Sequence, residues 1–422
     1  MTVLVASFYG DPRLANAPAQ FTRALTSALD REGIETAVWT GVSAPASAPP
    51  FRLRGTEVPV TVVPTPDRRR WLGDWLPHPE LRQFALRELS RLRPEAVVLS
   101  AWRGLSDVAL AARDLGLPTV LFLHDYSILC LRSWLLDAEG RLCKGPDTDS
   151  KCVGCFERAL GRRGRLRHTL CALPLAGAPI ARSFGRTPGD HLTVAGTVRE
   201  AREHMARILD SARLVVAQTP RARQILERQG VAAERIELVP QSLSPDKRLG
   251  RNREERPSDR PLRFVFLGRW SAEKGGDLLA EAFQAARLPE GTELWVIASN
   301  PETAALPPVH PTSGKRLRLF AGFSGAETSY LLARTDLCIV PSRCEDLASR
   351  ATLEAMEQGV PVVASDSVGN AYLIEDGVNG RIFPTGSAEA LRDALEGVAW
   401  KPEVISQWGS NLPKLPSPEE FG

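Results

Sequence analysis

The sequence predicts two α/β domains, each with a parallel β-sheet that helices cover on both faces. Short apolar runs alternate with amphipathic helical stretches along most of the chain. One charged segment, residues 246–260, interrupts this alternation, which then starts again. The length of 422 residues allows two or three domains of ordinary size. We therefore expect two α/β halves joined by a polar linker, with a ligand cleft between them.

The first half, residues 1–245, begins with an apolar run at 3–6, which predicts a strand, and an amphipathic run at 19–31, which predicts a helix. The same alternation continues to residue 239, with an insertion that contains several cysteines at about 127–200. Further strands are expected at residues 36–39, 96–99, 119–123, 214–217 and 236–239, and helices at 105–115 and 221–229.

The linker at 246–260 has many charged residues and only one large apolar residue, as a solvated hinge would. The second half, residues 261–395, repeats the alternation. Its strands are expected at residues 262–267, 293–298, 318–321, 337–340 and 360–364, and its helices at 276–286 and 353–358. The Pro-rich tail, residues 396–422, is expected either to pack back on the first domain or to be loose.

Composition and charge exclude several classes of protein. Hydrophobic residues make up 43% and charged residues 24%, which excludes a wholly disordered or collagen-like chain. The net charge of +3 is too small to indicate nucleic-acid binding by itself. No segment reaches the roughly 20 apolar residues that span a bilayer, and the start lacks the features of a signal peptide. We therefore expect a cytoplasmic protein, whose seven cysteines are thiols or metal ligands before they are disulfides.

The segment 266–276 has the residues of a diphosphate site. Its strand ends at Gly268 and a helix begins near Gly276, with Arg269 and Lys274 between them. The cations would neutralise phosphate charge, and the glycines would let the backbone approach the ligand. A solvated loop with ordinary surface cations explains this segment, taken alone, equally well.

A second segment, residues 340–365, carries three carboxylates near one strand end. Glu345 and Asp346 follow the strand, Ser349 is placed to cap the next helix, and Glu354 lies on that helix. A carboxylate can accept two hydrogen bonds from a diol, and the free amides of a helix start suit a phosphate or sugar oxygen. The alternative is that Glu354 simply faces solvent, as most helical glutamates do.

The order of these motifs resembles the family 4 retaining glycosyltransferases, which have the GT-B fold of two Rossmann-like domains facing across a cleft. The resemblance is strong over residues 262–384 and weaker over 214–239, where Ala217-Gln-Thr-Pro220 stands where the family has a strand-end serine. Its motifs are Arg269 to Gly275, Asp346 to Ala355, Gly359-Val-Pro-Val-Val-Ala-Ser365 and Glu375-Asp-Gly-Val-Asn-Gly380. Four ordered motifs in one domain are more specific than a single Gly-rich loop.

The resemblance implies a role for each matching residue. Arg269 and Lys274 would bind the donor diphosphate and stabilise the leaving group. Glu354 would hold the ribose hydroxyls of the nucleotide, and Asp346 would contact the donor sugar. The donor site would be completed near the sugar or phosphate by Gly268 and by the backbone amides of Leu347, Ala348 and Ser349.

Two departures from the family pattern touch the donor-sugar pocket. Asp346 stands where the family usually has Glu, which shortens the reach of the carboxylate by one methylene. The family's Phe-Gly after this acid is replaced by Leu347 and Ala348. Glu345, directly before Asp346, is therefore a second candidate for the contact with the donor sugar.

Two strand ends in the first half supply further candidates. Family members often have a Gly-Gly loop after the first strand, and Gly10 alone remains here as a candidate donor-binding residue. The strand at 119–123 delivers His124 and Asp125 to its carboxyl end, where open α/β sheets bind ligands. In similar enzymes a histidine at this position faces the donor sugar. The alternative is a histidine that a local carbonyl satisfies.

Four cysteines, Cys130, Cys143, Cys152 and Cys155, fall close together. The last two form a Cys-x-x-Cys knuckle, and four thiolates would make a closed, structural zinc site and not a catalytic one. A subset of family 4 enzymes has cysteines at similar places after a His-Asp-Tyr motif, which implies a local structural role. A disulfide pair and four free thiols stay open as alternatives.

Two basic stretches, residues 68–76 and 158–167, are rich in arginine. Either could touch anionic lipid head groups or a polyprenyl-phosphate acceptor, which would place the protein at the inner face of the membrane. A solvated Arg-rich face is the alternative.

The sequence thus predicts a retaining glycosyltransferase that moves a sugar from a nucleotide-diphosphate sugar to a glycan or lipid-linked glycan. The resemblance implies that the acceptor hydroxyl attacks on the face that the nucleotide leaves and that the diphosphate takes its proton, so catalysis requires no cofactor. A nucleotide-sugar epimerase of the same fold and a non-catalytic relative are the alternatives. No nucleic-acid partner is expected, because the net charge of +3 and 6% aromatic residues do not supply a basic, aromatic surface.

Overall fold

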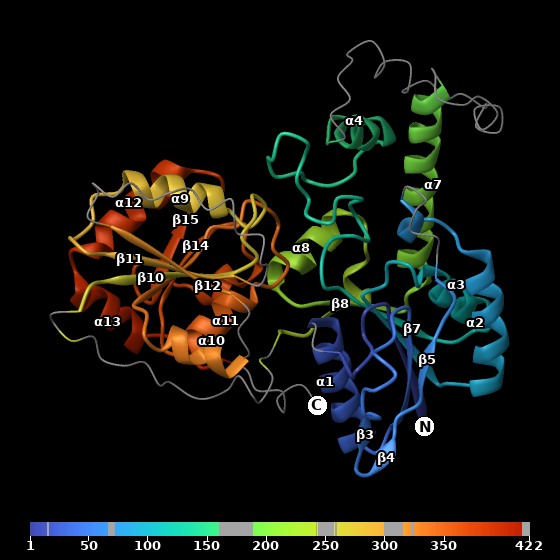
Figure 1. Ribbon diagram of the computed structural model, residues 1–422. Helices are drawn as coiled ribbons and strands as arrows, with labels where there is room; N and C mark the ends of the chain where they lie inside the picture. The colour runs from blue at the N-terminus through green and yellow to red at the C-terminus, as the bar shows by residue number, and fades with distance from the viewer. Residues whose placement is uncertain are drawn as a thin grey trace. The chain divides into compact units, whose positions relative to one another are not determined.

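The computed structural model describes residues 1–14, 17–65, 72–159, 189–241, 243, 257, 260–298, 315–321 and 325–415. The chain divides into two compact units (Figure 1). The first unit consists of Met1–Ala138, Cys143–Ala217 and Arg223–Val239, and the second of Glu139–Leu142, Gln218–Ala222 and Pro240–Gly422. Three segments lie mostly outside the described residues: the expected linker at 246–260, residues 68–71 of the first basic stretch, and the second basic stretch at 158–167. The hinge and the contact with anionic lipid or a polyprenyl phosphate therefore stay predictions.

The described residues of the first unit form a sheet of seven strands in the order β5-β2-β1-β6-β7-β8-β9. Neighbouring strands are parallel, as the alternation of strands and helices predicts. The strands are β1 (Thr2–Ser7), β2 (Glu35–Thr40), β5 (Val60–Val62), β6 (Ala96–Ser100), β7 (Thr119–Phe122), β8 (Leu214–Ala217) and β9 (Ile236–Leu238). A short antiparallel hairpin joins β3 (Arg52–Leu53) to β4 (Thr56–Glu57).

Helices connect these strands. They are α1 (Ala17–Arg31), α2 (Pro79–Leu92), α3 (Ser106–Asp114), α4 (Asp149–Ala159), α7 (Gly189–Ser211) and α8 (Pro220–Arg228), with the 3-10 helices η1 (Gly73–Trp75) and η2 (Ala233–Arg235). The first turn of α8, up to Ala222, belongs to the second unit. Among the helices of the described ranges, none is both long and apolar enough to cross a membrane.

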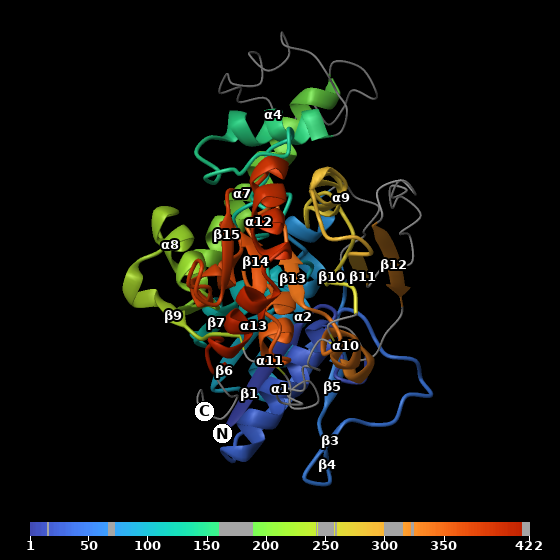
Figure 2. The ribbon, with the colours of Figure 1, turned by 90° about the vertical axis from the view of Figure 1, so that its left-hand side faces the viewer.

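The second unit repeats the design with a parallel sheet in the order β12-β11-β10-β13-β14-β15. Figure 2 shows these strands in this order across the view. The strands are β10 (Arg263–Gly268), β11 (Glu293–Ala298), β12 (Arg316–Ala321), β13 (Leu337–Val340), β14 (Val362–Ser365) and β15 (Gly380–Phe383). The helices are α9 (Gly276–Ala285), α10 (Gly325–Leu332), α11 (Arg350–Glu357), α12 (Ala388–Ala399) and α13 (Pro402–Ser410), with the 3-10 helix η6 (Gly369–Leu373).

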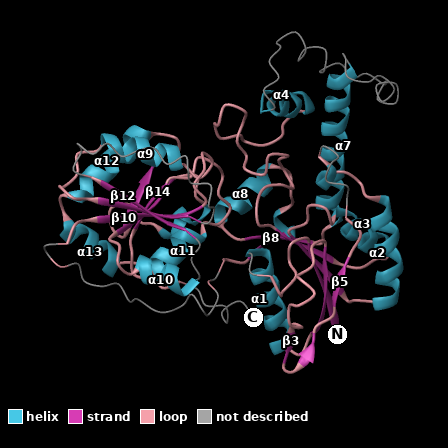
Figure 3. Cartoon of the chain, viewed as in Figure 1, coloured by secondary structure: helices cyan, strands magenta, loops and turns pink. Residues whose placement is uncertain are grey.

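Side chains of the second sheet alternate between two hydrophobic cores. Phe264 and Phe266 of β10 belong to one core, with residues of α9 and α12. Val265, between them, belongs to the other core, with residues of α10 and α11. Successive strand residues point to opposite faces, so a run that is apolar at every position is buried on both. Figure 3 shows α9 and α12 on one side of this sheet and α10 and α11 on the other.

The described part of the tail belongs to the second unit. Ile405 and Trp408 of α13 are buried in the core that contains Phe264, and Leu412 and Leu415 are buried in the opposite core. The sequence suggested that the tail packs back on the first domain or is loose. Its apolar residues instead complete both faces of the second sheet.

The strand order determines where a ligand can approach the second sheet. The chain runs from β10 outward to β12, then returns to place β13 on the other side of β10. The loops that follow β10 and β13 therefore leave adjacent strands in opposite directions. In doubly wound sheets this reversal opens a crevice at the carboxyl ends of the strands, where ligands bind. The two charged segments of the sequence lie in these two loops.

A buried polar cluster in the first unit joins α3 to α7. The ring of His204 is fully buried, and its Nε2 lies 2.9 Å from the Ser106 hydroxyl and 3.8 Å from the Asp107 carboxylate. Burial lowers the pKa of His204 to about 4, and the nearby charges of Arg207 and Arg82 add to this effect. Burial raises the pKa of the Asp107 carboxyl. The histidine is therefore neutral at pH 7.

We predict that this histidine makes the first unit sensitive to acid. The unfolded chain takes up the proton near pH 6.5, whereas the folded chain does so only near pH 4, so the stability contribution is lost as the pH falls from about 6.5 towards 4. The full effect is on the order of 3 kcal/mol. In thermal unfolding at pH 7.5, wild type should have a higher midpoint temperature than His204→Gln, and this difference should be smaller at pH 5. A difference in midpoint temperature that stays constant over this range would contradict the prediction.

Candidate functional site

The loop after β10 and the loop after β13 are packed directly against each other. Gly275 begins α9 with a φ of 73°, and a Cβ at this position would lie 1.8 Å from the carbonyl oxygen of Pro341. Only glycine accepts both the left-handed backbone and this approach. The backbone N–H groups of Arg343 and Cys344 donate to the Glu273 carbonyl at 2.9 and 3.3 Å. The cationic and acidic segments of the sequence are therefore one structural group.

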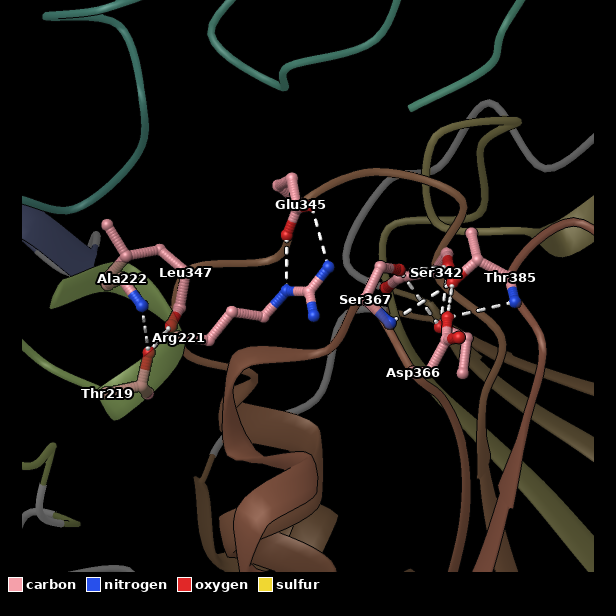
Figure 4. Close-up of polar contacts among 10 residues, drawn as sticks. Thr219, Arg221, Ala222, Ser342, Glu345, Leu347, Asp366, Ser367 and Thr385 are labelled. Carbon is pink, nitrogen blue, oxygen red and sulfur yellow. Dashed lines mark hydrogen bonds and ion pairs between the residues drawn. The ribbon is translucent and has the colours of Figure 1, made fainter. Parts of the chain in front are cut away.

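A third loop, after β14, meets the acidic loop at Asp346. The Asp346 N–H donates to the Ser367 carbonyl at 3.2 Å, and the Gly369 N–H donates to the Asp346 carbonyl at 2.6 Å. At the start of this third loop, Asp366 accepts hydrogen bonds from the backbone and side chain of Thr385 (Figure 4). The backbone of Asp346 is thus held on both its donor and its acceptor side.

The Asp346 carboxylate is buried and hydrogen-bonded. Lys274 Nζ donates to its Oδ2 at 2.7 Å, and the Ser342 hydroxyl donates to the same oxygen at 3.1 Å. The Ser342 carbonyl in turn accepts from the Ser365 hydroxyl at 2.6 Å and from the Ser367 hydroxyl at 3.0 Å. These contacts connect the ends of three strands to one carboxylate.

Lys274 is a cation at neutral pH. Burial disfavours its charged form, but the Asp346 carboxylate outweighs this effect and the pKa of Lys274 lies above its usual value. Arg269 is exposed and follows Gly268, the last residue of β10. Its positive charge lowers the pKa of Lys274, so the two cations are close. Two positive charges therefore stand at the reversal of strand order, where an anionic ligand would be attracted.

Helix α11 carries the remaining acid. The Ser349 hydroxyl caps the helix by accepting from the Thr352 N–H, as the sequence predicts. Glu354 is buried, and its Oε1 lies 3.4 Å from Arg350 Nη2. The alternative that Glu354 faces solvent is therefore wrong. Leu347 and Ala348 lie between Asp346 and this cap, at the start of the helix, where backbone amides lack intrahelical partners.

Glu345 has a different environment from Asp346. Its two carboxylate oxygens accept from Arg221 Nε and Nη2 at 2.6 and 2.7 Å (Figure 4). The sequence offered Glu345 as a substitute for Asp346 in a contact with the donor sugar. The structure pairs both of its oxygens with Arg221, so a contact with the donor sugar would use the remaining lone pairs of a carboxylate that this ion pair already orients.

The first-unit candidates lie at strand ends, as expected. His124 follows β7, and its Nε2 lies 2.6 Å from the hydroxyl of Ser100, at the end of β6. Its ring packs edge-on against Phe21. The partner of this ring nitrogen is thus a serine hydroxyl and not a backbone carbonyl. A Cβ on Gly10 would lie 2.3 Å from the Ser7 side chain and 2.6 Å from Thr22, so these side chains account for a glycine at this position.

The four cysteines of the insertion lie near one another as free thiols. Burial raises the pKa of Cys152 to about 11, Arg202 opposes this shift, and Cys130, Cys143 and Cys155 add to it. Nevertheless, no group of three or more His, Cys, Asp or Glu side chains in the described ranges is arranged to hold a metal ion. Structural zinc stays a prediction, which the zinc content of the purified protein tests, with Cys152→Ser as the control.

Comparison with protein-family models assigns both units. A model described as "Glycosyl transferase 4-like domain" matches residues 16–241, and a model described as "Glycosyl transferases group 1" matches residues 261–399. The first match covers more than half of the chain, which therefore belongs to this glycosyltransferase family.

Two curated relatives match part of the chain. A lipopolysaccharide core biosynthesis glycosyltransferase, LpsE of Rhizobium meliloti, is 34% identical over 143 residues, which is 34% of this chain and 40% of the relative. An alpha-D-kanosaminyltransferase of Streptomyces kanamyceticus is 30% identical over 162 residues, which is 38% of this chain and 42% of the relative. The matched region thus spans about two fifths of each relative's length.

Solved structures share the fold across nearly the whole chain. HepE of Anabaena, crystallised with UDP and glucose, has a TM-score of 0.60 at 17% identity and covers 97% of this chain and 93% of its own. Sucrose-phosphate synthase of Thermosynechococcus elongatus has a TM-score of 0.62 at 15% identity, with 97% and 92% covered. The protein is an α/β protein of the GT-B fold, as the sequence predicts.

We predict that Gly275 is required for the packing of the loops that follow β10 and β13. An alanine there combines a left-handed backbone with a clash against Pro341. Gly377 is a matched control, since its φ is 79° and a Cβ there meets nothing within 4 Å. Gly377→Ala should cost about 1 kcal/mol in unfolding free energy, and Gly275→Ala about 2–3 kcal/mol more. Chemical denaturation measures both, and equal losses would show that the contact with Pro341 is not a constraint.

Proposed function

We propose that the chain is a retaining glycosyltransferase that moves a sugar from a nucleotide-diphosphate sugar to a glycan or lipid-linked glycan. The observation that carries the proposal is the ion pair of Lys274 and Asp346 beyond the carboxyl ends of β10 and β13, with the buried Glu354 on α11, the helix that follows the same loop. Membership of the glycosyltransferase family supports it. The name of one curated relative, a lipopolysaccharide core biosynthesis glycosyltransferase, supports a glycan acceptor, and the name of the other, an alpha-D-kanosaminyltransferase, supports sugar transfer.

The proposed donor lies with its diphosphate at the two cations. Lys274 and Arg269 would neutralise the diphosphate as negative charge grows on it, which is the stabilisation that accelerates loss of the nucleotide. The buried Glu354 carboxylate would accept hydrogen bonds from the two ribose hydroxyls. The start of α11 would offer backbone amides to a phosphate or sugar oxygen. Asp346 would accept a hydrogen bond from a hydroxyl of the donor sugar.

The transfer step needs one bond to form and one to break at the anomeric carbon. The bond from this carbon to the diphosphate oxygen breaks, while the acceptor oxygen bonds to the same face. The acceptor proton passes to the leaving diphosphate oxygen. Lys274 is suited to assist because its cation is already held beside the sugar-side carboxylate by a 2.7 Å ion pair. Exclusion of water from the closed site would limit hydrolysis of the donor.

We predict that Glu354→Gln weakens nucleotide binding on the order of tenfold, because the amide keeps the shape of the side chain but loses the charge that strengthens its hydrogen bonds. UDP, GDP, ADP and dTDP would each be tested by thermal shift and titration, with UDP first because the HepE structure contains it. Glu357→Gln, three residues later on α11, is the control and should bind as wild type does.

The stereochemistry is tested separately. NMR of the product should show the anomeric configuration of the donor. An inverted product would reject the retaining mechanism, and a wild-type protein that binds no nucleotide would reject the proposed function as a whole.

A further inference from the structure

A short segment of the second unit, Gln218–Ala222, holds the acidic loop on both sides of Asp346. The Thr219 hydroxyl donates to the Leu347 carbonyl at 2.9 Å, directly after Asp346. Arg221 donates two hydrogen bonds to Glu345, directly before Asp346 (Figure 4). The two contacts therefore enclose a single residue of the loop, the one assigned to the donor sugar.

The local sequence explains why both side chains point at the loop. Thr219 caps the start of α8, since its hydroxyl accepts from the Ala222 N–H at 3.2 Å. Pro220 occupies the first helical position, where its fixed φ is favourable and no N–H is needed. Arg221 follows as the second helical residue. The cap fixes the direction of the first turn, and with it the origin of the Arg221 side chain.

The contacts are built as a specific pair and not as a loose surface attraction. Glu345 and Thr219 are buried, and the Arg221 side chain keeps about a third of its surface exposed. Two parallel N–H···O bonds between a guanidinium and a carboxylate fix orientation as well as distance. A lysine at this position would supply a point charge without that geometry.

We propose that Arg221 and Thr219 are positioning residues for the donor-sugar carboxylate of Asp346. An aspartate has one methylene fewer than a glutamate, so the backbone of residues 345–347 largely determines where its carboxylate lies. Arg221 and Thr219 hold that backbone from one side, while Ser367 and Gly369 hold it from the other. The inference rests on the proposed function, because it assumes that Asp346 contacts the donor sugar.

The proposal separates two parts of the donor. The nucleotide half is assigned to Glu354 on α11, whose Oε1 lies 3.4 Å from Arg350 Nη2. The sugar half is assigned to Asp346. Loss of the Arg221 or Thr219 contacts should therefore reduce turnover of the sugar donor and leave the affinity for the free nucleotide nearly unchanged.

The test compares Arg221→Lys, Arg221→Ala, Thr219→Val and Thr219→Ser in the full-length protein. Arg223→Ala is the matched control, because Arg223 lies on the same helix and pairs with Glu227 on an exposed surface, where an ion pair contributes little. We expect kcat to fall on the order of 10- to 100-fold in Arg221→Ala, Arg221→Lys and Thr219→Val, since a shift of about 1 Å can cost that much. The nucleotide Kd should change less than threefold. Thr219→Ser keeps the hydroxyl and should restore activity.

A charge-reversed double variant, Arg221→Glu with Glu345→Arg, provides a second readout. It should recover part of the activity that Arg221→Glu alone loses, because an ion pair across the same two positions can form again. If Arg221→Ala does not fold, Arg221→Lys and Thr219→Val carry the test.

The inference is overturned if these folded variants keep wild-type kcat, or if kcat and nucleotide affinity fall by the same factor. A wild-type protein without nucleotide binding or transfer would instead reject the proposed function. The two failures are therefore distinguishable in one set of measurements.

Discussion

The candidate site depends on the burial of one carboxylate. Removing Asp346 from water would cost several kcal/mol if it had no partners. The Lys274 ammonium and the Ser342 hydroxyl offset that cost, and each comes from a separate loop position whose backbone is held by other loops. Removing any of these contacts would leave a buried charge incompletely paired. The arrangement of the three loops is thus tied to the position of a single side chain.

The sheet topology makes this convergence attainable. β10 and β13 are adjacent in the sheet, although β11 and β12 separate them in the chain. Their following loops meet at a distance that only a glycine at position 275 permits, because Pro341 occupies the space of a Cβ. Gly369 plays the same part for the loop after β14, where a Cβ would lie 2.0 Å from the Leu347 carbonyl. Close backbone approach at these two points brings the side chains of three loops to one place.

This packing places the neighbouring acids Glu345 and Asp346 in different environments. Glu345 is paired with an arginine and Asp346 with a lysine. A guanidinium holds its partner through two bonds in a fixed plane, whereas an ammonium can turn towards a second anion. The first pair is therefore suited to support the loop, and the second to respond to a diphosphate. This difference is the physical basis for our proposal that Glu345 supports the loop and that Asp346 contacts the donor.

Local sequence patterns determined the secondary structure and the chemical types at the site. The expected strands at 3–6, 262–267 and 337–340 correspond to β1, β10 and β13. A strand that is buried on both faces is apolar at consecutive positions, so the sequence alone indicates it. The helix cap at Ser349 could also be predicted from the sequence, because a cap involves residues within one helical turn. Helices such as α2 and α12 and the strand β15 were not among the expected elements, and their apolar residues are interleaved with charged ones.

Only the tertiary structure decided which charges pair and which side chains are buried. Lys274 and Asp346 are 72 residues apart in sequence, and Arg221 and Glu345 are 124 apart. No periodicity links such residues, because their contact depends on strand order, loop length and the absence of a Cβ at a few points. The burial of Glu354 and the place of the tail depend on long-range packing for the same reason. The sequence determined the local helices and strands and the types of side chain available for the site. The tertiary fold decided which of these side chains come together.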